Sequence, residues 1–167
     1  MIWAFILLLI NNRLFHYYDR KENHMKIGTI VGALVGGAVM FLLGFLVFGM
    51  LFNEYFRANT VQYAGLEKDP PVFWAIFLFN VVWAYLIAFV LEYAGRTGWG
   101  EGAKVGAIIM FLLAVGLDME FHAFMNMHKE LSPMIFHVLI LTVMGAITGA
   151  VIGLVASFFD RRTVAAA

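Results

Sequence analysis

Four long apolar blocks dominate the sequence, and each is about as long as a membrane is thick. They run over residues 27–52, 72–93, 103–124 and 134–159. A helix needs about 20 apolar residues to cross a hydrocarbon core of about 30 Å. In lipid, each block must satisfy its own backbone hydrogen bonds, so each is predicted to be a helix. The sequence therefore predicts an all-α fold, an integral membrane four-helix bundle.

The composition supports this class and excludes others. Of 167 residues, 63% are hydrophobic and 13% are charged, whereas soluble domains are about 45–50% apolar. The net charge is zero and no basic stripe occurs, so we expect the lipid bilayer and no nucleic acid as a partner. The chain has no cysteine, which excludes disulfides, thiolate metal sites and cysteine nucleophiles. No phosphate loop or nucleophile elbow is present, so we lean against an enzyme.

Residues 1–26 precede the first block and form a separate segment. Residues 1–10 are apolar but too few to span a bilayer. Two interpretations stay open: an interfacial segment, or a start assigned too early, with Met25 as the true start. At the other end, residues 160–167 are expected to form a short cytoplasmic tail.

The lysines and arginines predict the orientation of the four helices. Eight lie on the side that holds both termini, at Arg13, Arg20, Lys21, Lys26, Arg96, Lys104, Arg161 and Arg162. The opposite side holds three, at Arg57, Lys68 and Lys129. Because cytoplasmic loops carry the excess of positive charge, both termini are predicted to be cytoplasmic (N-in/C-in). A start at Met25 leaves five against three and the same orientation.

Rows of glycine at four-residue spacing predict where helices touch. They comprise Gly28, Gly32 and Gly36 in the first block, Gly102 and Gly106 at the third, and Gly145, Gly149 and Gly153 in the fourth. Such rows let helix backbones approach closely in lipid. We expect a bundle that is narrow toward the cytoplasm and wider outside. Self-association into a homo-oligomer through the same rows is the alternative, and the two are compatible.

An unusual cluster of ionisable residues follows at the outer end of the third block. Asp118 and His122 are one helical turn apart, Glu120 points elsewhere, and His128 lies in the following loop. His137 lies at similar depth in the fourth block. Ionisable groups at membrane depth are costly and usually paired or functional. These five residues are therefore the candidate site.

Three interpretations of this cluster remain open. Asp118 and His122 can form a structural hydrogen-bonded pair, with Glu120 and His128 solvated. Alternatively, His122 and His137 can hold a metal or haem with the other three as further ligands, since imidazole and carboxylate suit zinc or iron and nearby methionines suit copper(I). The third interpretation is a proton relay or a small-ligand pocket. No ligand spacing selects a metal.

One further polar residue lies within a block. Asn80 is near the middle of the second block, on a face with Ile76, Ala84 and Ile87. We expect it to form an interhelical hydrogen bond worth about 0.6 kcal/mol, and a role in lining a pocket is the alternative.

The order of these features resembles a family of small bacterial membrane proteins, the domain of unknown function 1761 family. The resemblance covers residues 25–157 and rests on the glycine-rich first helix, on residues 101–106 (EGAKVG) and on residues 144–149 (MGAITG). It implies a four-helix bundle in a bacterial inner membrane and no assigned activity. We expect a non-enzymatic accessory or small-ligand-binding bundle that acts alone, as a homo-oligomer or with a membrane protein partner. The alternative is a metal- or haem-binding membrane protein.

Overall fold

The structure, a computed structural model, describes residues 27–65 and 67–165, with side chains described through Asp160. The predictions for residues 1–26 and for the tail's arginines lie outside the described residues. The helical elements are α2 (Ile27–Gly44), the π-helix η1 (Phe45–Leu51), α3 (Asn53–Asn59), α4 (Phe73–Tyr93), α5 (Trp99–Phe124) and α6 (Ser132–Ala165).

Four helical stretches among the described residues are long and apolar enough to cross a membrane. They are Ile27–Leu51, Phe73–Tyr93, Trp99–Phe124 and Ser132–Asp160. The chain is therefore a polytopic integral membrane protein, as predicted. The boundaries differ in places: α6 begins at Ser132 and continues to Ala165, and helical backbone continues past the first block as α3.

The start of α5 was predicted too late. The third apolar block was predicted to begin at residue 103, but α5 begins at Trp99. Of the glycines in residues 95–102, Gly95 and Gly98 adopt positive φ, at 63° and 100°, the conformation that disfavours other residues. Glycine at position 102 instead serves packing inside the helix, and composition alone does not distinguish these two uses.

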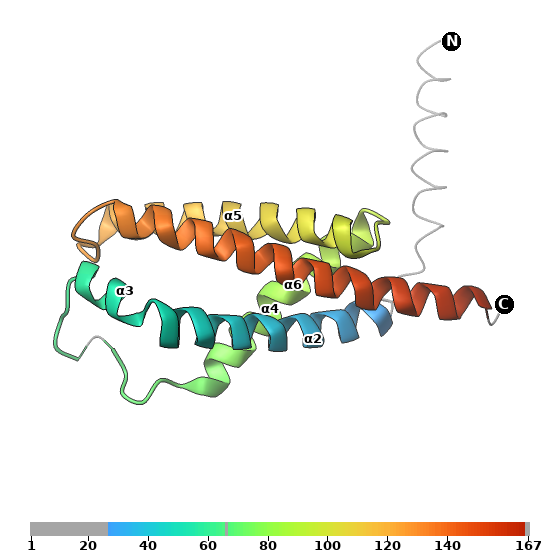
Figure 1. Cartoon of the computed structure of the whole chain (residues 1–167), viewed down its shortest axis with the longest axis horizontal. Helices are drawn as coiled ribbons and strands as arrows, with labels where there is room; N and C mark the ends of the chain where they lie inside the picture. The colour runs from blue at the N-terminus through green and yellow to red at the C-terminus, as the bar shows by residue number, and fades with distance from the viewer. Residues whose placement is uncertain (1–26, 66, 166–167) are drawn as a thin grey trace, which may run out of the picture.

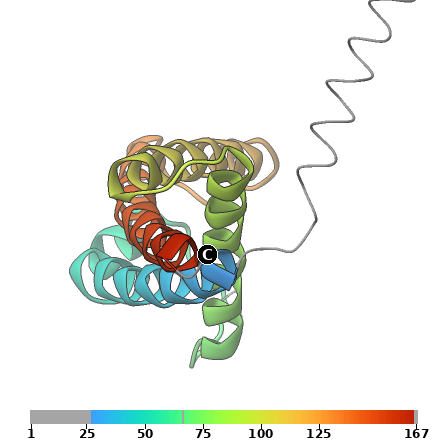
Figure 2. The same ribbon diagram turned by 90° about the vertical axis from the view of Figure 1, so that its right-hand side faces the viewer.

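Figure 1 shows α2, α5 and α6 running along the long axis of the molecule while α4 crosses them obliquely. In the end view of Figure 2, α6 lies between α5 and α2. The closest packing joins α5 to α6, then α2 to α4 and to α6, whereas α4 touches α5 little. We call the end with Ile27, the α4–α5 turn and the C-terminus the terminal end. The end with the α3–α4 and α5–α6 connections is the loop end.

The glycines of α5 and α6 bring the two backbones into direct contact near the terminal end. A Cβ atom on Gly102 would overlap the backbone oxygen of Gly149, and one on Gly106 would overlap that of Gly145. The amide of Gly98 donates to the oxygen of Gly153 over 3.0 Å. At this interface no side chain separates the helices, so any larger residue would force them apart.

The glycines of α2 form a similar surface toward α6 and α4. A Cβ on Gly28 would lie 2.9 Å from the Cβ of Phe159, and one on Gly36 would lie 2.6 Å from the Cγ1 of Ile152 and 3.3 Å from the Cβ of Ala84. The rows on α2, α5 and α6 are therefore occupied within one chain. Beside them, the buried core continues with Ala33, Met40, Ala84, Ile87, Ala88, Leu91, Met110, Met144 and Ile152.

Candidate functional site

The loop end departs from regular helix geometry where α2 becomes η1. The amide of Phe52 donates to the oxygen of Val47, five residues back, over 2.9 Å. Phe52 then breaks the helix before α3 begins at Asn53. The rings of Phe48 and Phe56, on either side of the break, lie 5.3 Å apart. π-Helical turns of this kind occur often at functional sites.

Asp118 of α5 and His137 of α6 pair with each other across the interface between these two helices. His137 Nδ1 lies 3.0 Å from Oδ1 and 2.9 Å from Oδ2 of Asp118. The side chain of Asp118 is 5% exposed and that of His137 is 30% exposed. Asp118 continues the buried face of α5 that carries Gly106, Met110 and Ala114. The carboxylate therefore faces α6, and its partner comes from that helix.

Aromatic rings cover the imidazole of His137. Its ring centroid lies 5.5 Å from that of Phe48 and 6.2 Å from that of Phe56. Phe136 extends the cluster, with ring contacts to Phe52, Tyr55 and Phe56. Apolar rings thus flank the imidazole, and the carboxylate of Asp118 is buried, which strengthens the hydrogen bond between them because the local dielectric is low.

The two loop-end connections are tied together above this cluster. Thr60 and His128 form an isolated antiparallel bridge. The amide of Val61 donates to Met127 O over 2.7 Å, and Lys129 Nζ donates to Ala58 O over 2.7 Å. The bridge holds the C-terminal end of α3 over α5 and α6.

The predicted pairing of Asp118 with His122 is wrong, because Asp118 bonds His137 instead. His122 and Glu120 are exposed, and His128 is half-buried with no hydrogen-bond partner for its Nδ1. Spacing along α5 could not show that α6 offers an imidazole across the interface. Of the five candidate residues, the structure brings together only Asp118 and His137. Residues 27–65 and 67–160 contain no group of three or more histidine, aspartate or glutamate side chains that could hold a metal.

Asn80 is buried as expected, but its hydrogen bond is not interhelical. Its Nδ2 donates to the oxygen of Ile76 in the same helix over 2.7 Å. Asparagine readily bonds a carbonyl one turn back. A nearby backbone acceptor therefore replaced the expected partner from another helix.

A cavity of about 400 Å³ lies next to the aromatic cluster. We call it the loop-end cavity, and its lining consists of Phe48, Asn53, Phe56, Arg57, Thr60, Gln62, Glu67, Lys68, Asp69 and Pro71. Phe48 and Phe56 both line the cavity and contact the imidazole of His137. The sequence did not indicate this cavity because its lining comes from both sides of a π-helical break and from the loop that follows α3. The run of polar residues after Phe52 was the only feature of the sequence that could have indicated it.

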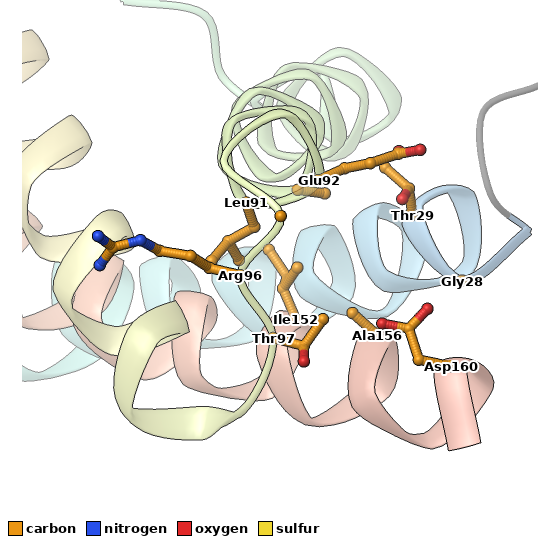
Figure 3. A pocket seen from close by; sticks show the side chains of 11 residues that line it. Gly28, Thr29, Leu91, Glu92, Arg96, Thr97, Ile152, Ala156 and Asp160 are labelled. Atoms are coloured by element: carbon orange, nitrogen blue, oxygen red, sulfur yellow. The ribbon is translucent and has the colours of Figure 1, made fainter. Parts of the chain in front are cut away.

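A second, smaller hollow of about 100 Å³ lies at the terminal end (Figure 3). Thr29, Glu92, Thr97 and Asp160 supply its polar lining. The side chain of Arg96 extends away from the hollow in Figure 3 and pairs with Glu101 of α5. This hollow is too small for most organic ligands, which occupy about 300–1,000 Å³.

No family model, curated protein or solved structure was found to match this chain. Function therefore has to be argued from the site itself. The resemblance to the domain of unknown function 1761 family stays a prediction.

Proposed function

We propose that the protein is a non-enzymatic membrane bundle that binds a small amphiphilic ligand in the loop-end cavity. The observation that carries this proposal is a cavity of about 400 Å³, which falls within the usual volume of ligand sites. Its lining joins two phenylalanine rings to amide, hydroxyl and charged groups. A ligand with one apolar and one polar side matches that lining.

The charge distribution predicts that this cavity opens outside the cytoplasm. Arg57, Lys68 and Lys129 are basic residues of the loop end, whereas Arg96 and Lys104 lie at the terminal end, and the other six lysines and arginines of the sequence precede α2 or lie near the end of α6 in the chain. The positive-inside rule places the terminal end in the cytoplasm. In a bacterial inner membrane, the ligand would enter from the periplasm or the outer leaflet.

Self-association through the glycine rows is not part of this proposal. Those rows are filled by contacts within one chain, so a homo-oligomer or a membrane protein partner would use another face. The metal or haem hypothesis needed His122 and His137 in one ligand set, whereas His122 is exposed and no group of three or more such ligands occurs among the described residues. Two phenylalanine rings beside polar side chains in the cavity lining support a small organic ligand better.

The absence of cysteine gives a direct test. Gln62→Cys places one thiol on the cavity lining, and Ala58→Cys places one on an exposed residue of α3 outside that lining. Phenol and toluene are suitable probes because each offers a ring of a size the cavity holds. We expect at least one of them to slow alkylation at position 62 by about twofold or more at half-saturation, and to leave position 58 unchanged. Equal protection at both positions, or none at either, would refute the proposal.

A further inference from the structure

The charged residues that line the loop-end cavity add a chemical requirement to its ligand. We infer that the ligand is a small zwitterion of the apolar amino acid class, with an ammonium and a carboxylate group beside an apolar side chain. This inference rests on the proposed function, since it names the ligand class of the same cavity. It follows from which polar side chains of the lining are already engaged and which are left for a ligand.

The uncharged polar side chains of the lining are already engaged. Asn53, Thr60 and Gln62 each donate a hydrogen bond to a backbone oxygen of η1 or α3, over 3.3, 2.7 and 3.5 Å respectively. Bonds of this kind satisfy the backbone where a helix breaks or ends. These donors therefore serve the fold of the loop end, and recognition of a ligand falls to the other polar groups of the lining.

The charged side chains of the lining have no such partners. Arg57 and Lys68 are basic, whereas Glu67 and Asp69 are acidic. All four residues are exposed. Within the described part of the chain, none of the four side chains forms a hydrogen bond or an ion pair. The lining therefore offers two cations and two anions that have not neutralised one another.

This balance of charge favours a ligand that carries both signs. A ligand with a single charge would meet two groups that attract it and two that repel it, and like charges in contact oppose binding. The two acidic residues flank Lys68 in the sequence, so opposite charges alternate along this loop. The ammonium and carboxylate of an amino acid are attached to one carbon, so both can face the same charged side of the cavity.

The apolar part of the lining limits the size of the ligand's apolar group. Phe48, Phe56 and Pro71 are the apolar residues of the lining, and the two phenylalanine ring centroids lie 5.3 Å apart. Aromatic rings favour offset or edge-to-face contact with a further ring. Three apolar residues suit one ring or a short branched chain, because a lipid acyl chain would extend along the polar remainder of the lining.

Phenylalanine, phenethylamine and 3-phenylpropionate form a matched set of probes. All three carry a phenyl group on a two-carbon chain, but phenethylamine lacks the carboxylate and 3-phenylpropionate lacks the ammonium group. The measurement is the dissociation constant of each probe, from protection of Gln62→Cys in one detergent. The ratio of the constant for phenethylamine to that for phenylalanine is the carboxylate preference. The corresponding ratio for 3-phenylpropionate is the ammonium preference.

Removal of one pair of charges should lower one preference. The carboxylate preference of the protein with all four native charges should exceed that of Arg57→Gln/Lys68→Gln by about threefold or more, the scale of one exposed ion pair. Glu67→Gln/Asp69→Asn should lower the ammonium preference by a similar factor. Each comparison uses one detergent, so partition of the probes into micelles cancels. Preferences that are the same in all three proteins would overturn the inference.

Two control variants remove charge outside the lining. Lys129→Gln and Glu54→Gln alter exposed residues of the loop end that do not line the cavity, and both preferences should stay unchanged. Changes as large as those of the double variants would mean that the probes respond to overall charge, which contradicts the assignment. Protection by phenol or toluene with unaltered preferences overturns the zwitterion and leaves the proposed function intact. Failure of both phenol and toluene to protect the cysteine would refute the proposed function itself.

Discussion

The two ends of the α5–α6 interface are held together by different contacts. Toward the terminal end, Gly102 and Gly106 place backbone directly on the backbone of Gly145 and Gly149. Toward the loop end, Asp118 and His137 join the same helices through side chains, beneath aromatic rings. Backbone contact leaves no space and tolerates no added atom. Side-chain contact separates the helices and creates room that a ligand can use.

The course of α4 follows the same division. It packs along α2 and touches α5 little, and it crosses the other helices obliquely in Figure 1. On α2, a Cβ at Gly37 would lie 2.7 Å from the Cα of Val81, so this crossing also depends on glycine. The tight crossings fix the helices at the middle and terminal end, and the loop end is completed by η1, α3 and the bridged loops.

The largest predicted effect comes from adding one methyl group to the glycine interface. Gly106→Ala would place Cβ on the backbone oxygen of Gly145, which no rotamer change can relieve. We expect a loss of about 3 kcal/mol or more in the free energy of unfolding, the upper range for overpacked sites. Reversible denaturation by dodecyl sulfate in mixed micelles would measure it.

Gly116→Ala is the matched control for that prediction. It is the same substitution on the same helix, at a glycine whose added Cβ would meet nothing within 4 Å. Alanine favours helix over glycine by roughly 0.5–1 kcal/mol, so this variant should be neutral or slightly more stable. If Gly106→Ala were as stable as Gly116→Ala, α5 and α6 would be able to move apart at little cost.

The next effect is expected at the loop end of the same interface. His137→Ala leaves the buried carboxylate of Asp118 without its partner. We expect a loss of about 2 kcal/mol, less than for a fully buried pair because the imidazole is partly exposed. His122→Ala, an exposed position on α5, should change little.

A double-mutant cycle on Asp118→Ala and His137→Ala isolates the pair itself. Polar contacts between membrane helices average about 0.6 kcal/mol and reach about 1.7 kcal/mol. Two short contacts to a buried carboxylate predict a coupling near the upper value. Additive losses would mean that the two residues contribute through separate packing rather than through their hydrogen bond.

A smaller effect of opposite sign is predicted for Thr148 in the middle of α6. Its side chain is 0% exposed, and its hydroxyl has no hydrogen-bond partner among the described residues. Thr148→Val keeps the shape and removes the unsatisfied group, so we expect a gain of about 1 kcal/mol. Thr142→Val is the control, because that hydroxyl donates to Val138 O over 2.7 Å. A loss at position 148 equal to that at 142 would indicate that the Thr148 hydroxyl finds a partner in the membrane.

The sequence predicted most of the fold because membrane helices depend on long, uniform features. Block length fixed the four spans to within a few residues, apart from the start of α5. Four-residue spacing also indicated which glycines could bring helices together. Both signals are local, because each can be judged from one helix at a time.

The candidate site was harder to predict because it depends on relations between helices. Asp118 and His137 were both identified as candidates, but predicting the hydrogen bond between them requires knowing how α5 is rotated relative to α6. Phe48 and Phe56 gave no signal, since a phenylalanine in a membrane helix usually faces lipid or core. The π-helical break that brings their rings together at 5.3 Å has no marker in residue spacing. The prediction for Asn80 was wrong for a related reason, because a backbone carbonyl within its own helix accepts its hydrogen bond.

The smallest predicted effect concerns the tie between the two loop-end connections. Lys129→Ala removes the bond from Nζ to Ala58 O but keeps the one from its amide to Asn59 O, at 3.1 Å. Because the lysine is exposed, we expect a loss of about 0.5 kcal/mol. Hydrogen exchange of the Val61 amide, which donates to Met127 O, should therefore accelerate by about twofold.

Lys68→Ala is the control for this last prediction, because Lys68 is an exposed lysine of the loop-end cavity outside the bridge. It should leave exchange at Val61 unchanged. Acceleration well above twofold with Lys129→Ala would mean that one side chain holds the two connections over the site. The loop end would then be a hinged cover, in contrast to the fixed backbone contact at the other end of the same helices. No acceleration would mean that the backbone bonds suffice to hold the two connections together.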